Sequence, residues 1–282
     1  MNIKEIVSKC KKEFNAKNIM DIYKLIAYSI NLSMDDFLLR KDDLILTSKE
    51  EVGIFNLLNR YYVLKEPLQY ITGYQNFYNE KYKVIPSVLI PRSDTEVLVE
   101  EAIKYINNYN LKTCLDLCTG SGAIGISIAK NSNIAKVYMS DISKDALDVA
   151  KENIELNNAG NKCSLILSNF FESINFEEKL QIIVSNPPYI SKAEMLVLDE
   201  YVKKEPHLAL YGGENGLDAY IEILKVAPKV LEDNGYIMLE IGYNQKEELK
   251  KVIKGFNCYE YVECKKDYAM KDRVIICRFH QK

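Results

Sequence analysis

The chain reads TCLDLCTGSGAIG from Thr113 to Gly125. The first five residues are mostly apolar and predict a buried strand, and the glycines that follow have the spacing G-x-G-x-x-G at the start of a predicted helix. The next predicted strand, residues 136–140, is followed directly by Asp141. This order of strand, glycine loop, helix, strand and acid is typical of α/β folds that bind nucleotides, in which the acid accepts hydrogen bonds from the ribose hydroxyls.

Strands and helices alternate through the rest of this region. Further strands are predicted at residues 164–167, 180–185, 236–241, 259–265 and 273–279. The clearest helices are predicted at residues 95–107, 144–157 and 219–231. The alternation predicts a doubly wound, mostly parallel seven-stranded sheet with helices on both faces. Because only a loop separates the last two strands, we expect that pair to be antiparallel.

The first part of the chain follows a different pattern. Residues 1–74 carry apolar side chains at helical spacing. Ser33 precedes Asp36 by three residues and Ser48 precedes Glu51 by three, which is the capping pattern of a helix start. We therefore expect residues 1–74 to form a small all-helical domain.

Residues 75–92 separate this helical part from the α/β part. Their period changes, and the extended segments 82–85 and 88–90, split by Pro86, predict a β-hairpin linker. Residues 93–282 then form the predicted α/β domain, which carries both of the loops considered as functional sites.

Composition narrows the classes of function. The formal net charge of −3 weighs against a partner held mainly through phosphate contacts, so we expect no direct contact with nucleic acid. Seven cysteines without a CxxC pair predict reduced thiols and a cytoplasmic location. The chain has only two histidines, His207 and His280, so no metal site is expected. No apolar run is long enough to span a bilayer, so we expect no membrane association.

A second loop predicts the kind of substrate. Asn186-Pro187-Pro188-Tyr189 directly follows the strand predicted at 180–185, at the end of the strand where open α/β sheets bind their ligands. Two consecutive prolines fix two φ angles and remove two backbone donors, which leaves a rigid turn with free carbonyl groups. Such a turn suits a flat NH₂ group, because carbonyl oxygens accept its protons while the aromatic ring covers its face.

The glycine loop by itself fits either a dinucleotide or S-adenosylmethionine. Asp116 lies inside the strand before the loop, where an acid suits a cationic sulfonium and amino group better than a pyrophosphate. The alternative for Asp116 is an acid that caps a helix or accepts hydrogen bonds within the protein. If the two loops are neighbours, the donor methyl would face the NH₂ group. The Asn186 side-chain oxygen and the Pro187 carbonyl would accept both N–H protons, so that positioning and electrostatics promote transfer without a dedicated base.

Several motifs together resemble a known family. The chain looks like the class I S-adenosylmethionine-dependent methyltransferases that act on planar NH₂ groups, and more closely like the peptide chain release factor glutamine N5-methyltransferases, the HemK/PrmC family. The resemblance covers nearly the whole chain and rests on residues 66–73, 89–96, 116–124, 186–190, 205–206 and 216–218. Residues 89–96, Leu-Ile-Pro-Arg-Ser-Asp-Thr-Glu, are much more specific to this family than the glycine loop.

The resemblance implies transfer of a methyl group from S-adenosylmethionine, which becomes S-adenosylhomocysteine, to the glutamine N5 of a Gly-Gly-Gln loop. The implied protein substrates are peptide chain release factors 1 and 2, bound with the help of the helical domain, and the enzyme is expected to be a monomer. The implied catalytic residues are Asn186, Pro187 and Tyr189. The implied substrate-binding residues are Asn186, Pro187, Pro188 and Tyr189. The implied cofactor-binding residues are Cys118, Thr119, Gly120, Ser121, Gly122, Asp141, Asn169, Phe170 and Asn186.

The chain departs from the family pattern near the cofactor site. Cys118 stands where the family usually has glycine, so the backbone there must tolerate a Cβ atom. Asn169 stands where aspartate is common and Phe170 where tryptophan is frequent. The Asn169 side-chain oxygen can still accept a hydrogen bond from the adenine amino group. Arg92 is expected either to approach the active site or to form a structural ion pair.

Two other functions are compatible with some of these motifs. A DNA adenine-N6 amino-methyltransferase uses the same Asn-Pro-Pro-Tyr chemistry on a flipped base, but it would need a basic target-reading region. Residues 1–74 carry mixed charge instead. In a non-catalytic protein, the helical part would be an interaction module on a degenerate nucleotide fold. The intact Gly120, Gly122, Asp141 and Asn186 argue against that alternative.

Overall fold

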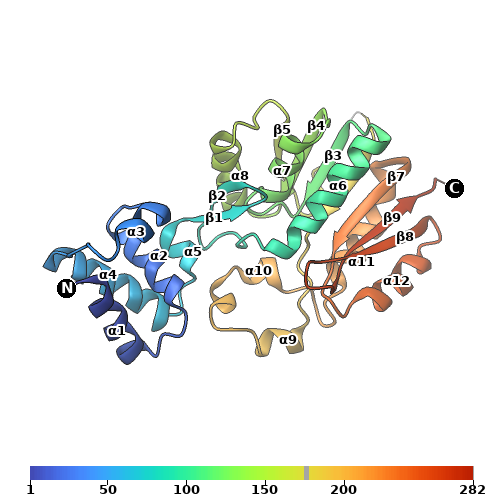
Figure 1. Cartoon of the computed structure of the whole chain (residues 1–282). Helices are drawn as coiled ribbons and strands as arrows, with labels where there is room; N and C mark the ends of the chain where they lie inside the picture. Colours follow the sequence, from blue (N-terminus) through green and yellow to red (C-terminus); the bar gives the residue numbers. More distant parts are fainter. Residues whose placement is uncertain (175–177, 282) are drawn as a thin grey trace. The chain divides into compact units, whose positions relative to one another are not determined.

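The computed structural model describes residues 1–174 and 178–281, and this part of the chain forms two compact units (Figure 1). The first unit comprises Met1–Tyr74 and Asp199–Lys204, and the second comprises Gln75–Leu198 and Glu205–Lys282. Within the described residues, no helix is long and apolar enough to cross a membrane.

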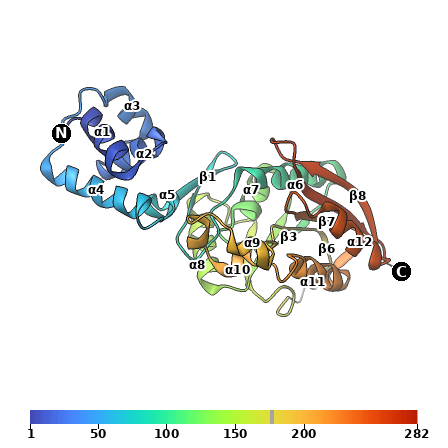
Figure 2. The ribbon, with the colours of Figure 1, turned by 90° about the horizontal axis from the view of Figure 1, so that it is seen from below.

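The first unit is built from helices. They are α1 (Ile3–Phe14), α2 (Ile19–Ser29), α3 (Met34–Arg40), α4 (Ser48–Tyr62) and α5 (Leu68–Thr72), joined by the short 3₁₀ helix η2 (Val202–Lys204). Their apolar faces share one core, in which Ile22, Leu25 and Leu58 are fully buried. Figure 2 shows α1, α2 and α3 gathered at the N-terminal end of this unit.

The helix starts in this unit test the capping predictions. Ser33 does cap α3, because its hydroxyl accepts a hydrogen bond from the Asp36 amide at 3.1 Å. The predicted Ser48–Glu51 box on α4 is wrong by one residue. Thr47 is the cap, extended at ψ 158°, and it exchanges hydrogen bonds with Glu50. The pairs Thr47–Glu50 and Ser48–Glu51 both satisfy the capping-box pattern. In the structure the pair that comes first is used, and Ser48 therefore belongs to the helix.

The second unit is organised by one large sheet. Within the described residues it has seven strands in the order β5-β4-β3-β6-β7-β9-β8. They are β3 (Thr113–Leu117), β4 (Lys136–Asp141), β5 (Cys163–Leu167), β6 (Leu180–Ser185), β7 (Leu231–Glu240), β8 (Tyr259–Lys266) and β9 (Asp272–Phe279). The strands from β5 to β7 pair in parallel, whereas β9 is antiparallel to both β7 and β8. The doubly wound, mostly parallel sheet and its antiparallel final pair are therefore confirmed.

Helices cover both faces of this sheet (Figure 2). One face is covered by α6 (Glu96–Tyr109), α7 (Ala123–Asn131) and α8 (Lys144–Leu156), and the other by α11 (Asp218–Val226) and α12 (Lys246–Gly255). Successive residues of a strand point to opposite faces of the sheet and so belong to two hydrophobic cores. Val184 faces the first group of helices and Ile183 the second. Both residues are fully buried, as expected for a parallel strand covered on two sides.

The helix predicted at 219–231 is too long. After α11 the chain tightens into the 3₁₀ helix η3 (Ala227–Lys229), and β7 already begins at Leu231. Pro228 lies in η3 and lacks the amide proton that an α-helix would need at this point. Shorter helices in this unit are η1 (Ser93–Thr95), α9 (Lys192–Leu196) and α10 (His207–Leu210).

A hairpin is present in the linker region, but its strands differ from those predicted. It pairs β1 (Tyr74–Phe77) with β2 (Glu80–Lys83). Tyr78 and Asn79, between the strands, both have positive φ angles, of 48° and 63°. Two such residues make the tight turn that matches the twist of a hairpin. The predicted strand at 88–90 does not form, and residues 84–92 contain two prolines that cannot donate to a ladder.

Candidate active site

The glycine loop leaves β3 where the strand order reverses, since β4 lies on one side of β3 and β6 on the other. This switch point is the usual ligand site of an open α/β sheet. The loop turns sharply because Cys118, Gly120 and Gly122 all have positive φ, at 62°, 54° and 85°. At Gly122 the φ of 85° favours glycine, and a Cβ atom there would also lie 2.8 Å from the terminal methyl of Met139, which would have to shift.

Asp116 supports this loop from below. Its side chain is fully buried, and one carboxylate oxygen accepts hydrogen bonds from the Thr119 hydroxyl and, at 2.9 Å, from the Gly125 amide. Burial raises the pKa of Asp116 to about 7, although both donors favour the charged form. Asp116 lines neither of the two pockets described below, so the structure gives no support to its predicted role facing a cation.

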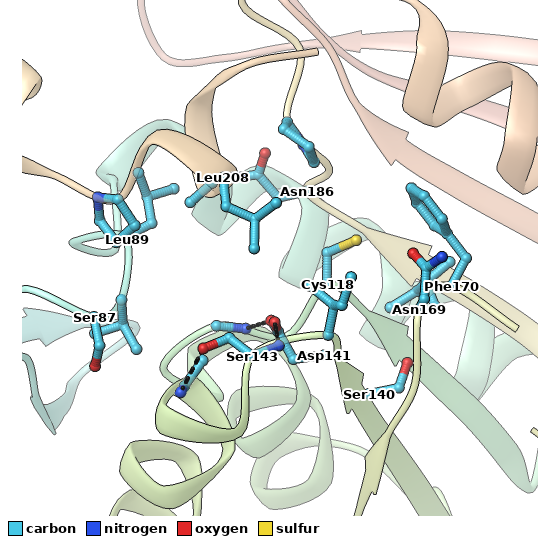
Figure 3. Close-up of a pocket in the computed structure, with 18 of the residues that line it drawn as sticks. Ser87, Leu89, Cys118, Ser140, Asp141, Ser143, Asn169, Phe170, Asn186 and Leu208 are labelled. Atoms are coloured by element: carbon cyan, nitrogen blue, oxygen red, sulfur yellow. Dashed lines mark hydrogen bonds between the residues drawn. The ribbon is translucent and has the colours of Figure 1, made fainter. Parts of the chain in front are cut away.

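A pocket of about 850 Å³, its open mouth included, lies beside the glycine loop. Its lining includes the predicted cofactor residues Cys118, Gly120, Asp141, Asn169, Phe170 and Asn186, and also Pro188. Figure 3 shows Asn169 and Phe170 at one end of the pocket and Ser87 and Leu89 at the other. The mostly apolar wall suits a ligand with a flat ring system.

Asp141 supplies the acid of this pocket. It ends β4, and its two oxygens accept hydrogen bonds from the Gly120 amide at 2.8 Å and the Ser143 amide at 2.9 Å. Burial raises the pKa of Asp141, and these backbone donors oppose that rise. Each carboxylate oxygen has a further lone pair, so the group can also accept hydrogen bonds from a pair of ribose hydroxyls.

Asn169 and Phe170 fit the base of a nucleoside. The Asn169 amide nitrogen donates to Glu172 at 2.9 Å, which leaves its side-chain oxygen as the free acceptor. Phe170 has a φ of 45° and lines the same pocket. An acceptor beside an aromatic ring matches an adenine amino group and ring face, so these residues fit the adenosine portion of S-adenosylmethionine.

A second pocket of about 380 Å³ adjoins the first. The two share Leu89, Cys118, Gly120 and Asn186, so Asn186 faces both. Thr119 and Ser121, predicted to bind the cofactor, line only this second pocket. Gly122, Pro187 and Tyr189 line neither pocket.

Arg92 combines the two alternatives predicted for it. It lines the second pocket, and its guanidinium forms an ion pair with Glu205. The Glu205 side chain is nearly fully buried and also accepts a hydrogen bond from the Ile90 amide at 3.0 Å. A half-exposed arginine with a buried carboxylate partner is therefore held at the rim of the second pocket.

Residues distant in sequence hold the loop at residues 186–189, here called the Asn-Pro loop. Gln245 donates from its side-chain nitrogen to the carbonyls of Tyr189, at 2.9 Å, and Gly216, at 3.1 Å. Gly212 approaches so closely that a Cβ atom there would lie 2.6 Å from the Pro188 carbonyl oxygen.

Sequence reasoning missed most of these supports. Gly216 was noticed only as part of a family motif, and Gln245 carries no local signal at all. The one available signal was the glycine-rich segment at residues 212–216, because clustered glycines often mark a close approach between backbones. Thr95 and Glu240 also contact the Asn-Pro loop; Thr95 was noticed only as part of the family motif at residues 89–96, and Glu240 was not singled out.

Metal chemistry finds no obvious ligands here. Within residues 1–174 and 178–281, no group of three or more histidine, cysteine, aspartate or glutamate side chains could hold a metal ion. The polar groups that line the two pockets are an acid, amides, hydroxyls and backbone groups, which can form hydrogen bonds with a ligand.

Comparisons with known proteins agree with this geometry. The family described as "Methyltransferase small domain" matches residues 93–214. The release factor glutamine methyltransferase of Clostridium acetobutylicum is 40% identical over 85% of this chain and 87% of its own length. The chain belongs to the release factor glutamine methyltransferase family. The resemblance inferred from the sequence motifs is thus confirmed.

The family extends over the helical part of the chain as well. The release factor glutamine methyltransferase of Thermodesulfovibrio yellowstonii is 40% identical over 97% of this chain and 95% of its own length. A solved methyltransferase from Pyrococcus furiosus has a TM-score of 0.54 at 15% identity, covering 84% of this chain and all of that one. The structural likeness shows the fold alone, namely the class I methyltransferase fold.

Proposed function

We propose that this protein transfers a methyl group from S-adenosylmethionine to the side-chain amide nitrogen of the glutamine in the Gly-Gly-Gln motif of release factors 1 and 2. The observation that carries the proposal is the position of Asn186, which faces both the nucleoside-sized pocket and the smaller pocket beside it. A single side chain can therefore touch an acceptor amide held next to a methyl donor.

The larger pocket takes the donor in this proposal. Asp141 accepts hydrogen bonds from the ribose, while Asn169 and Phe170 bind the adenine. Cys118, Thr119, Gly120, Ser121 and Gly122 bring the backbone close to the methionine part. S-adenosylmethionine supplies an electrophilic methyl group and leaves as S-adenosylhomocysteine.

The Asn-Pro loop activates the acceptor. An amide nitrogen is a poor nucleophile because its lone pair is delocalised into the carbonyl group. The Asn186 side-chain oxygen and the Pro187 carbonyl accept the two N–H protons, and Pro188 and Tyr189 pack around the amide plane. Electron density returns to the nitrogen, which attacks the methyl carbon, and the extra proton of the product is lost after the bond has formed. Positioning and electrostatics thus carry the step.

The remaining parts of the proposal concern the whole chain. Residues 1–74 help to bind the release factor, residues 75–92 link them to the transferase, and residues 93–282 catalyse the transfer. We propose a monomeric enzyme acting in the cytoplasm, in accord with seven cysteines that the sequence predicts to be reduced.

Mass spectrometry of release factor peptides tests the proposal. Release factor 1 or 2 is incubated with the protein and S-adenosylmethionine and then digested. We expect a gain of about 14 Da, one methyl group, on the Gly-Gly-Gln peptide. A variant release factor with the glutamine replaced by alanine should gain nothing. No gain on the native peptide, or an equal gain on the variant, overturns the proposal. A duplex oligonucleotide in parallel reveals any DNA adenine methylation, the alternative function.

A further inference from the structure

Two side chains from separate elements, Thr95 and Glu240, contact the Asn-Pro loop, and Thr95 also lines the second pocket. The Asn186 amide nitrogen donates to the Thr95 hydroxyl oxygen at 3.3 Å, and the Tyr189 hydroxyl donates to a Glu240 carboxylate oxygen at 3.4 Å. The Thr95 hydroxyl also lies beside the Glu240 carboxyl, where it favours the charged form. Thr95 ends η1, and Glu240 ends β7, the strand next to β6.

This arrangement fixes which way the Asn186 amide points. An asparagine side chain has an oxygen and a nitrogen of nearly equal size, and only its partners select the orientation. An ionised Glu240 can only accept hydrogen bonds, so its charge favours a Thr95 hydroxyl whose proton points towards it; among the described residues the hydrogen bond found at this carboxyl comes from Tyr189. The Thr95 oxygen is then left as an acceptor, and it pairs with the Asn186 nitrogen. The Asn186 oxygen consequently remains available to the pockets.

We propose that Thr95 and Glu240 are positioning residues that orient the Asn186 amide with its oxygen towards the substrate NH₂ group. This inference rests on the proposed function for the identity of that substrate, but the orientation itself does not depend on it. If the amide were reversed, an NH₂ group would face an NH₂ group, and neither could accept a proton from the other.

The burial and charge of Glu240 suit it to act as a hydrogen-bond acceptor beside Thr95. It is only 1% exposed, and one of its oxygens has no hydrogen-bond partner among the described residues. Burial raises its pKa to about 7, while Arg273 lowers it and Asp94 raises it. Arg273 is itself shared with Asp267, at 2.9 Å, and Asp94, at 3.3 Å, so its charge is only partly available to Glu240.

Protonation of Glu240 should therefore loosen the orientation. The groups that face it are Thr95, Tyr189, Arg273, Asp94 and the buried Tyr220. When the pH falls through about 7, the Glu240 carboxyl gains a proton and can itself donate a hydrogen bond. The Thr95 hydroxyl then no longer has to point its proton towards Glu240. We expect kcat to fall as the pH drops below about 7 through this group, since the Asn186 amide can then adopt both orientations.

Kinetic measurements on paired variants test the proposal. Thr95→Val keeps the shape of the side chain but removes the hydroxyl, whereas Thr95→Ser keeps the hydroxyl. We expect Thr95→Val to lower kcat about tenfold or more, with the dissociation constant for S-adenosylmethionine unchanged, and Thr95→Ser to retain most activity. Glu240→Gln should lower kcat and abolish the fall in rate below pH 7. Tyr82→Phe is the matched control, since it removes a buried hydroxyl pair with Ser127 that lines neither pocket.

A spectroscopic measurement separates this inference from the proposed function. In protein with ¹⁵N-labelled asparagine, the Asn186 NH₂ signal is identified by its loss in Asn186→Asp. We expect slow solvent exchange of these protons in the wild type and in Thr95→Ser, and faster exchange with a shifted signal in Thr95→Val. An unchanged signal in Thr95→Val overturns the inference, as does an unchanged kcat. A wild type that shows the expected signals but leaves release factors unmodified overturns the proposed function alone.

Discussion

The glycine loop at residues 118–122 and the Asn-Pro loop at residues 186–189 leave the neighbouring strands β3 and β6 at one edge of the sheet, yet they are held in different ways. Some partners of the glycine loop are close in sequence, whereas the Gly120 amide donates to Asp141, 21 residues on, and the Ser121 carbonyl accepts from the Asn153 side chain, 32 residues on. Asp116 binds Thr119 and Gly125, and the Gly122 amide donates to the Thr119 carbonyl at 2.9 Å. This loop is shaped by its own residues and their positive φ angles.

The Asn-Pro loop depends on residues from far along the chain. Its prolines make it stiff, but its place is set by Thr95, Gly212, Glu240 and Gln245. Each loop lies over one buried acid with a pKa of about 7, Asp116 or Glu240. The two acids differ in the sequence separation of their partners. Asp116 accepts hydrogen bonds from residues within nine positions, whereas Glu240 contacts residues from separate elements. We infer that the glycine loop is held by residues within about 32 positions, whereas the Asn-Pro loop also depends on residues 51 to 91 positions away.

The largest expected effect is the loss of Asn186. Asn186→Ala removes the acceptor proposed for the substrate amide, so kcat should fall about 10²- to 10³-fold, or about 3 to 4 kcal/mol in transition-state stabilisation. If the two sites are encoded separately, affinity for S-adenosylmethionine measured by calorimetry should change only a few-fold. A loss of cofactor affinity as large as the loss of rate would contradict the division between the loops.

The buried Glu240 predicts how stability depends on pH. Burial raises the pKa of Glu240 from the ordinary value of 4.5 to about 7, so its contribution to folding is complete below about pH 4.5 and is lost as the pH rises through 7. That shift corresponds to a loss on the order of 3 kcal/mol. Urea unfolding of the wild type and Glu240→Gln at pH 5 and pH 8 measures it. The wild type should lose stability relative to the variant at pH 8. If the free energies of unfolding of the two proteins changed equally between pH 5 and pH 8, the prediction would be wrong.

An intermediate effect is expected from crowding the Asn-Pro loop. In Gly212→Ala the new Cβ would lie 2.6 Å from the Pro188 carbonyl, so the loop must shift. We expect kcat to fall about tenfold to a hundredfold, or about 2 kcal/mol, with cofactor affinity retained. Gly160→Ala is the matched control, because its nearest neighbour is an ordinary 3.8 Å away. Full activity in Gly212→Ala would show that the loop tolerates displacement.

The smallest effect concerns strain in the glycine loop. Cys118 has a φ of 62°, a conformation that costs a residue with a Cβ atom about 1 kcal/mol or more and glycine almost nothing. Cys118→Gly and Cys118→Ala both remove the sulfur, but only glycine relieves the strain. Chemical unfolding should therefore find the glycine variant more stable than the alanine variant by about 1 kcal/mol. Equal stability would mean that the positive φ carries no local penalty.

Predictions from the sequence succeeded where the signal was local. The strand at residues 180–185 coincides with β6, and the glycine loop and Asp141 lie at the predicted edge of the sheet. The hairpin was misplaced because the Tyr78-Asn79 turn lacks the glycine that usually marks such turns. For Asp116 the structure shows the hydrogen-bonded alternative, since its side chain accepts from Thr119 and Gly125, and a role towards a cation stays a prediction.

The amino-acid sequence alone therefore determined the fold class, the family, the glycine loop and the identity of the Asn-Pro loop, because each is carried by neighbouring residues or by the period of apolar side chains. Only the tertiary structure brought Thr95 and Glu240 to Asn186, across sequence separations of 91 residues and, from Tyr189 to Glu240, 51 residues. Such meetings follow from the strand order, which places the end of β7 beside the end of β6. No local pattern records that order, and for this reason the supports of the acceptor site could not be found before the fold was known.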